Sequence, residues 1–233
     1  MIVKEANVYV VETGSFRPVV VELVTDDGIS GIGEASVGFG VGCYAAGTMI
    51  ADLAKCFVVG KNPANICDIW NDFYYHTFWG KGAGAIFYAA VSALEQALWD
   101  IKGKALGVPV YDLLGGKQRD ELRVYANDWS DGRCDTPANF AKRATEVVAD
   151  GFDAIKMYPL SQKDPIRNMN MHLKNREIGR EAYRRCIDSV RMVREAVGDG
   201  GCDRGGNHRH NDPHRPRDRT LSALLVRGAA GCL

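Results

Sequence analysis

A run of small and apolar residues over 90–104 limits the fold of this chain more than any other feature of the sequence. The apolar residues recur at the spacing of one helical face: Ala90, Leu94, Ala97, Leu98, Ile101 and Ala105. Small side chains at Ser92 and Ala93 let another backbone approach that face closely. Gly107 and Pro109 are typical of a helix end. The run therefore predicts a long helix packed tightly against a second layer.

The residues before this helix predict a meander of strands followed by helices. Alternation of apolar and polar residues predicts the strands, and Asp26-Asp27-Gly28 suits a hairpin turn. Apolar residues at helical spacing predict the helices. The predicted elements are strands over 2–11, 18–25 and 29–35 and helices over 43–58 and 64–78.

The residues after residue 121 predict alternating strands and helices. The expected order is a strand at 122–126, a helix at 138–150, a strand at 152–157 and a helix at 176–197. Asp135-Thr136-Pro137 is typical of a helix start. Such alternation favours β/α units with parallel strands.

Composition indicates an ordinary globular enzyme, with 46% hydrophobic residues, 25% charged residues and a formal net charge of zero. No apolar run reaches the length of about 18 residues that spans a bilayer, and the first residues lack the pattern of a signal peptide. The seven cysteines form no CxxC pair, which favours reduced thiols. We expect a cytoplasmic protein without a nucleic-acid or membrane partner.

The segment from Ala90 to Gly116 resembles the signature that ends the capping domain of one branch of the enolase superfamily, that of mandelate racemase and muconate lactonizing enzyme. The small residues, both acids Glu95 and Asp100, and Pro109 fall in register with it. Most alanine-rich helices are only packing elements, but the order of meander, helices and β/α units on either side matches the family's cap and barrel. The resemblance implies an α+β capping domain over 1–115, followed by part of a (β/α) TIM-type barrel over 116–197.

The length of the chain limits how much of a barrel it holds, because eight β/α units need about 250 residues. Only two units are predicted before residue 198, and 198–233 shows no strand-like alternation. Every basic residue there is Arg, and three of the five His residues of the chain lie there. We interpret 198–233 as the product of a shifted reading frame and expect it to be disordered.

Two functional alternatives for 198–233 have weak support. The candidate zinc ligands are Cys202, His208, His210, His214 and Cys232. Their spacing matches no zinc motif. The arginines are diluted by acidic residues and accompanied by no aromatic residue, which argues against a nucleic-acid-binding arm.

The resemblance implies abstraction of a proton next to a carboxylate, with Mg²⁺ stabilising the enediolate. In the relatives, the three metal ligands stand at the ends of barrel strands three, four and five. Those strands come after the two predicted units. We therefore assign no metal ligand, and we expect neither Mg²⁺ binding nor activity from this chain alone.

The predicted strand at 152–157 ends where the relatives carry a Lys-x-Lys signature, with Lys156 at the first lysine and Tyr158 at the second. The second lysine is a base in the relatives, whereas a Tyr with an ordinary pKa near 10 is a poor base at neutral pH. Tyr158 is better suited to donate a proton to a leaving hydroxyl, with Lys156 beside it as electrostatic support. The alternative is a pair of solvated residues at a strand end.

Loss of that base favours an acid-sugar dehydratase, so a small carboxylate is the expected ligand. A cycloisomerase or a racemase of the same superfamily is the alternative. By the same resemblance, substrate contacts come from two cap loops and from the rim after the first barrel strand. The candidate substrate-binding residues are Phe16, Arg17, Phe39, Asn127 and Trp129. The alternative for the glycine-rich loops is that they are only turns. Trp129 could equally pack in a core instead of binding substrate.

Two further alternatives stay open at this point. The chain could be a non-catalytic fragment that acts only as an interaction module. It could also be one part of a split enzyme, with a second polypeptide supplying the rest of the barrel. The family is usually homo-oligomeric.

Overall fold

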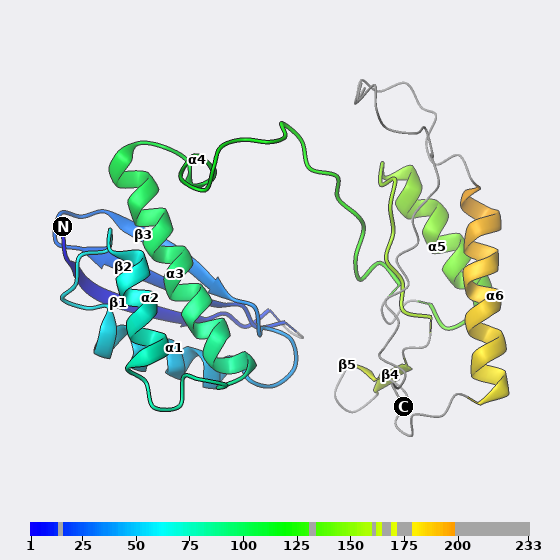
Figure 1. Ribbon diagram of the computed structural model, residues 1–233. Coiled ribbons are helices and arrows are strands. Elements are labelled where there is room, and N and C mark those ends of the chain that lie inside the picture. The colour runs from blue at the N-terminus through cyan, green and yellow to red at the C-terminus, as the bar shows by residue number, and fades with distance from the viewer. Residues whose placement is uncertain (14–15, 131–133, 160–161, 165–168, 172–178, 199–233) are drawn as a thin grey trace. The chain divides into compact units, whose positions relative to one another are not determined.

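The computed structural model describes residues 1–13, 16–130, 134–159, 162–164, 169–171 and 179–198 (Figure 1). The chain divides into two compact units, Met1–Asp120 and Glu121–Leu233. Each unit is described by itself.

The first unit contains a three-stranded antiparallel sheet in the order β1-β2-β3 (Figure 1). The strands are β1 (Val3–Val10), β2 (Val19–Thr25) and β3 (Ser30–Ala35). Gly28 has a φ of 85° in the turn between β2 and β3, a conformation that glycine adopts without steric cost. The predicted meander is confirmed, including its hairpin turn.

Helices follow the sheet in the order α1, α2, α3 and the short α4 (Figure 1). Their bounds are Cys43–Phe57, Ile66–Tyr75, Ala85–Leu106 and Val110–Leu113. The predicted long helix is confirmed, but α3 already begins at Ala85. Gly107 ends it with a φ of 68° and donates its backbone N–H to the last turn of the helix.

Two glycines let α3 lie directly on β3. A Cβ built on Gly33 would be 1.9 Å from the carbonyl oxygen of Ala93, and one on Gly31 would be 2.1 Å from that of Ala97. No larger residue fits there, so the small residues that the sequence places on α3 are matched by glycines on β3. The core of this unit consists mainly of apolar residues of β2, α1 and α3, among them Val21, Leu23, Ile50, Leu94, Leu98 and Ile101.

The second unit pairs helix α5 (Pro137–Ala149) with helix α6 (Arg180–Val197). The Thr136 hydroxyl accepts a hydrogen bond from the Asn139 backbone N–H at 3.3 Å, which caps the start of α5. A two-stranded antiparallel sheet, which the sequence did not predict, joins β4 (Gln162–Asp164) to β5 (Met169–Met171). The predicted start of the last helix at residue 176 lies outside the described residues.

The predicted strands at 122–126 and 152–157 are wrong in extent, because among the described residues the two segments are joined by one parallel bridge, between Ala126 and Ile155. The Ala126 N–H donates to the Ala154 oxygen, and the Lys156 N–H donates to the Ala126 oxygen, both at 2.9 Å. The parallel direction agrees with a β/α unit. Parallel strands are normally buried within a wider sheet, and one short pairing gives little support to longer strands.

The second core lies around this bridge. It contains Ala126, Trp129, Phe140, Ala144, Val147, Ile155, Met157 and Val193. The predictions for residues 199–233, including the disorder and the weak zinc alternative, lie outside the described part of the chain. No helix in the described ranges is long and apolar enough to cross a membrane.

Candidate functional site

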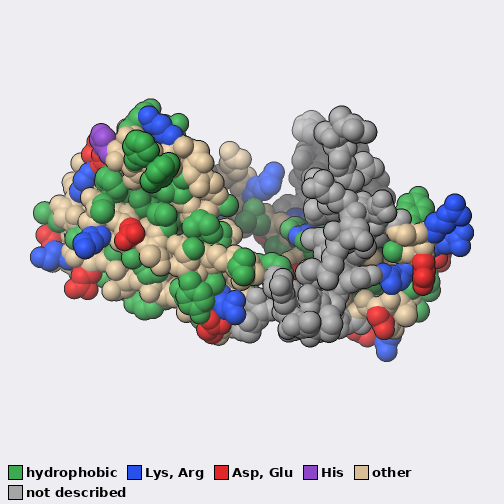
Figure 2. Space-filling view, turned by 90° about the horizontal axis from the view of Figure 1, so that it is seen from below, with side chains coloured by type: hydrophobic (Ala, Val, Ile, Leu, Met, Phe, Trp, Pro, Cys, Tyr) green, Lys and Arg blue, Asp and Glu red, His purple; other side chains and the backbone are tan. Residues whose placement is uncertain are grey.

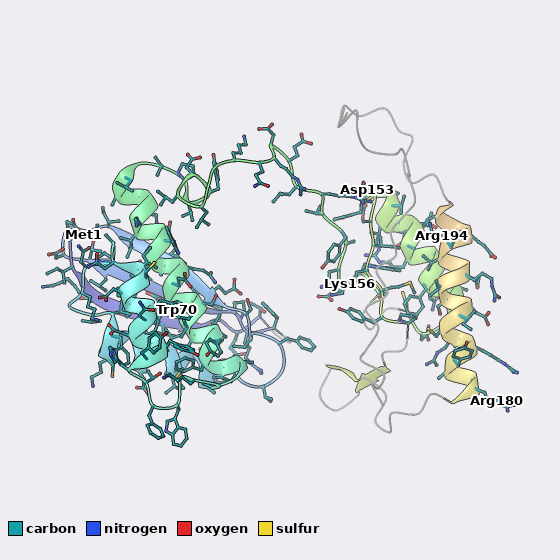
Figure 3. The ribbon with its side chains drawn as sticks, viewed as in Figure 1. Met1, Trp70, Asp153, Lys156, Arg180 and Arg194 are labelled. Atoms are coloured by element: carbon teal, nitrogen blue, oxygen red, sulfur yellow. The ribbon has the colours of Figure 1, made fainter. Side chains whose placement is uncertain are left out.

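Lys156 and Tyr158 lie on the same side of the chain, just after the bridge. Ile155 and Met157 alternate with them and are each only 1% exposed, so they point into the core. The Lys156 Nζ lies 4.8 Å from the centroid of the Tyr158 ring, within the range of a cation–π contact. Figure 3 labels Lys156 on the extended chain between α5 and the β4–β5 sheet. The two predicted catalytic residues are therefore in contact.

Contacts at both ends of the bridged segments fix how they pair. Arg123 Nε donates to both carboxylate oxygens of Asp153, at 3.1 and 3.0 Å. At the other end, the Trp129 indole N–H donates to the carbonyl oxygen of Lys156 at 2.7 Å. The Trp129 ring meets the Phe140 ring edge to face, with 6.2 Å between centroids. The segment that carries Lys156 is thus tied to the preceding segment by side chains as well as by backbone.

The surroundings of Lys156 keep its side chain charged. The hydrogen bond with Tyr158 raises the pKa of the Lys156 ammonium most, and the nearby Tyr125 and Asp128 raise it further, against the opposing effect of burial. Asp128 is also the one non-glycine residue with a positive φ, 56°, in the described part of the chain. A protonated lysine cannot accept a proton from a substrate. It can stabilise negative charge that develops next to it.

The second group of predicted residues lies in the first unit, where two loops pack together. Phe16 and Phe39 form an isolated antiparallel bridge, and the Arg17 N–H donates to the Gly38 oxygen at 2.7 Å. Phe16 is 43% exposed and Phe39 57% exposed. The structure thus brings Phe16, Arg17 and Phe39 together in one exposed loop pair.

Glu12 is the residue of this loop pair that the sequence analysis did not assign. Its carboxylate accepts from Arg17 Nε at 3.0 and 2.9 Å and from the Tyr44 hydroxyl at 2.5 Å. The Tyr44 hydrogen bond and then the Arg17 contact lower the pKa of Glu12. Glu12 conversely raises the pKa of the Arg17 guanidinium. The only signal in the sequence was an acid five positions before an arginine, and that spacing is common in loops.

Two predicted substrate-binding residues differ in their surroundings. The Asn127 side chain is exposed at the end of the first bridged segment. Trp129 is only 4% exposed, within the second core. The predicted residues therefore divide between the two units. Phe16, Arg17 and Phe39 lie in the first, and Asn127, Trp129, Lys156 and Tyr158 lie in the second.

The described residues do not fit the family's magnesium ion. Magnesium requires near-octahedral oxygen ligands, usually including carboxylates. Within the ranges that the structure describes, no three Asp, Glu, His or Cys side chains lie close enough to share a metal ion. The described residues therefore supply no complete ligand set for that ion.

Figure 2 shows hydrophobic side chains in several patches on this face of the first unit, with charged groups among them and along its edge. At the end of α2 and in the loop after it, Tyr75, Phe78 and Trp79 are 60%, 86% and 81% exposed. The Lys81 Nζ lies 5.2 Å from the centroid of the Tyr75 ring. Two adjacent aromatic side chains as exposed as Phe78 and Trp79 are uncommon on a monomer surface.

Comparison with known families and proteins adds to this geometry. Residues 6–115 match the family described as "Mandelate racemase / muconate lactonizing enzyme, N-terminal domain". Over 181 residues the chain is 37% identical to D-gluconate dehydratase of Thermoproteus tenax. The matched residues make up 78% of this chain and 33% of that protein. Over 133 residues the chain is 46% identical to D-galactonate dehydratase of Xanthomonas oryzae pv. oryzae, covering 57% of this chain and 32% of that protein.

Solved structures show the same likeness. A member of the enolase superfamily from Salmonella Typhimurium superposes with a TM-score of 0.75 and 38% identity, covering 84% of this chain and 52% of that one. A mandelate racemase/muconate lactonizing enzyme from Sulfitobacter sp. has a TM-score of 0.69 and 28% identity, covering 85% of this chain and 51% of that one. The chain thus spans about a third of the length of the curated relatives it matches, 33% and 32%, and about half of these solved chains.

Proposed function

We propose that this chain, which belongs to the mandelate racemase/muconate lactonizing enzyme branch of the enolase superfamily, supplies the cap and the first barrel segments of an acid-sugar dehydratase. The curated relatives named D-gluconate dehydratase and D-galactonate dehydratase support this reaction and suggest a sugar acid of that kind as substrate. The cytoplasmic location and the homo-oligomeric state stay predictions.

The contact between Lys156 and Tyr158 carries the proposal. Dehydration of an acid sugar removes a proton from the carbon next to the carboxylate and expels a hydroxyl from the adjacent carbon as water. In this proposal Tyr158 donates its phenolic proton to the departing hydroxyl, and the Lys156 ammonium stabilises the phenolate that remains. The proton on the carbon next to the carboxylate goes to a base that the remaining barrel supplies. That base releases the proton to solvent, and the Tyr158 phenolate takes one from solvent, which closes the cycle.

The charge on Lys156 favours dehydration over racemisation. Racemisation needs a proton acceptor on each face of the reacting carbon. At this strand end the possible acceptors are a lysine whose raised pKa keeps it protonated and a tyrosine, which is a poor base at neutral pH. Tyr158 can instead donate a proton, and the charged Lys156 can stabilise the phenolate that this leaves.

In the cap, Arg17 is the residue proposed to bind substrate hydroxyls or the carboxylate. Its Nε is bound to Glu12 on one side. A guanidinium has five N–H donors in a planar fork, so binding Glu12 through Nε leaves other donors for a ligand. Phe16 and Phe39 are proposed to exclude water from that ligand.

The proposal is tested in a chimaera in which residues 1–197 are followed by the remaining barrel of one of the dehydratase relatives. With D-gluconate and D-galactonate as substrates, Lys156→Ala and Tyr158→Phe are each expected to lower kcat by about 10²–10⁴-fold, the usual effect of removing a positioned acid–base group. Tyr183→Phe, which removes a hydroxyl from an exposed residue of α6, is the matched control and should leave turnover unchanged. The chain without the added barrel should be inactive.

Tyr158→Phe is the most informative of these variants, because it keeps the ring under the Lys156 ammonium and removes only the hydroxyl. Unchanged kcat and KM in Tyr158→Phe, in a chimaera that is active, would contradict the proposal. Circular dichroism of each variant establishes that a loss of turnover is not a loss of fold.

A further inference from the structure

We propose that Trp129 is a positioning residue for Lys156 and Tyr158, acting through the hydrogen bond from its indole N–H to the carbonyl oxygen of Lys156. The catalytic meaning of this role rests on the function proposed above. The role itself is a statement about how the two side chains are held, and it can be measured without turnover.

Burial separates this role from the direct substrate contact expected from the sequence. Trp129 is 4% exposed and Phe140, its edge-to-face partner on α5, is 6% exposed. A ring enclosed in this way cannot lie against a substrate at the surface. Its N–H nevertheless reaches the Lys156 oxygen at 2.7 Å, which is at the short end of the range for an N–H···O bond.

The bond fixes the backbone of Lys156 on both sides of its Cα. The Lys156 N–H donates to Ala126 at 2.9 Å, and the Lys156 carbonyl accepts from Trp129. Both groups are therefore bound to the same segment, 126–129. With the N–H and the C=O of one residue held, the direction of its Cβ is held too, and that direction sets where the ammonium lies relative to the Tyr158 ring.

The conformation of Asp128 supports this role. Its φ of 56° is uncommon for a residue other than glycine, and such a conformation persists only when its surroundings hold it. Here the chain turns between Ala126, which is in the bridge, and Trp129, which is in the core. The turn lets one segment bond the backbone of Lys156 twice.

The charges facing Lys156 are consistent with a fixed position. Tyr158, Tyr125 and Asp128 all raise the pKa of the Lys156 ammonium, with Tyr158 first. These contributions depend on distance, so they weaken if the end of the segment frays. The pKa of Lys156 therefore reports whether the arrangement is kept.

The experiment replaces Trp129 in the full chain with 3-benzothienyl-alanine, which keeps the bicyclic ring and lacks the N–H. Lys156 is followed by ¹³C NMR of its ε-carbon and by the ring-current shift that the Tyr158 ring imposes on the ε-protons, both assigned with Lys156→Arg. We expect loss of most of the ring-current shift and a fall of the Lys156 pKa toward its ordinary value. Trp129→Phe is the genetically encoded counterpart and should act in the same direction.

Two controls separate positioning from packing. Trp99→Phe removes an indole N–H that donates to Glu95 at 3.3 Å in the first unit, and it should leave the Lys156 signals unchanged. Phe140→Leu weakens the packing around Trp129 but keeps its N–H, so it should lower the unfolding midpoint and keep the ring-current shift.

The outcomes are distinguishable. A folded benzothienyl variant with the wild-type ring-current shift and the wild-type Lys156 pKa would overturn the positioning role, as would an equal loss of the shift in Phe140→Leu. If the shift is lost as expected but Lys156→Ala and Tyr158→Phe leave the chimaera fully active, the positioning role stands and the dehydratase role of the pair fails.

Discussion

At the scale of single residues, Glu12 links the first cap loop to the start of α1 by a charge that pH can remove. Hydrogen bonds from Tyr44 and Arg17 lower the pKa of Glu12 in the folded chain. A carboxyl whose folded pKa is depressed stabilises the fold above its unfolded pKa, and this contribution is lost as the pH falls through the folded pKa. The link between this loop and α1 should therefore persist at neutral pH and open only in acid, below the ordinary range of a glutamate.

We predict that Tyr44→Phe raises the pKa of Glu12 toward its ordinary value, because the Tyr44 hydroxyl makes the largest contribution to the shift. The measurement is a pH titration of the Glu12 side-chain carboxyl by ¹³C NMR, assigned with Glu12→Gln. Tyr9→Phe is the matched control. It removes a hydroxyl that donates to Glu22 at 3.2 Å, away from the loop pair, and should leave Glu12 unchanged. A Glu12 pKa that is equal in wild type and Tyr44→Phe would contradict this link between the loop and α1.

At the scale of elements, α3 closes the outer edge of β3 with its side chains. The Ile32 N–H donates to Asp100 at 2.9 Å, the Glu34 N–H donates to Gln96 at 3.1 Å, and both acceptors are side-chain oxygens of α3. Lys104 donates to the Ser30 oxygen at 2.8 Å. An edge strand with free N–H and C=O groups is a site for pairing with another chain. Here α3 occupies those groups, and Gly31 and Gly33 let it come close enough to do so.

The pairing of α3 with β3 predicts a residue-specific result in hydrogen exchange. Asp100→Ala should speed amide exchange at Ile32 and leave Glu34 slow, whereas Gln96→Ala should speed Glu34 and leave Ile32 slow. Asp100→Asn keeps a carbonyl acceptor and should protect Ile32 better than Asp100→Ala does. Backbone exchange followed by two-dimensional NMR makes the comparison. Equal exchange of both amides in all three variants would show that the edge is protected by something else.

The same elements show where sequence reasoning succeeds and where it stops. Periodicity predicted the meander and the long helix because β2 alternates buried and half-buried residues and α3 has a continuous apolar face. It overestimated the strands at 122–126 and 152–157, since strand length depends on neighbouring strands that a local pattern does not contain. It placed Lys156 beside Tyr158 by alternation alone. It did not reveal that Trp129 donates to Lys156, because that bond depends on the turn at Asp128.

At the scale of the whole molecule, the described residues form two separate hydrophobic cores. The first contains buried residues only from Val3 to Ile101, and the second only from Ala126 to Val193. The first joins a sheet to three helices, whereas the second, in the part of it that the structure describes, rests on two helices and the bridge between Ala126 and Ile155. Because stability grows with the apolar surface that folding buries, the first unit should be the more stable.

We predict two transitions when the full chain is unfolded in urea, the second unit unfolding at the lower concentration. Leu98→Ala, in the first core and 1% exposed, should lower only the upper transition, and Ile155→Ala, in the second core and 1% exposed, only the lower one. Each substitution should cost about 2–5 kcal/mol, the usual loss for a buried leucine or isoleucine. Circular dichroism follows both transitions, and a chain of residues 1–120 should reproduce the upper midpoint by itself. A single cooperative transition that both substitutions lower together, with residues 1–120 unfolded in isolation, would mean that the two cores depend on each other for stability.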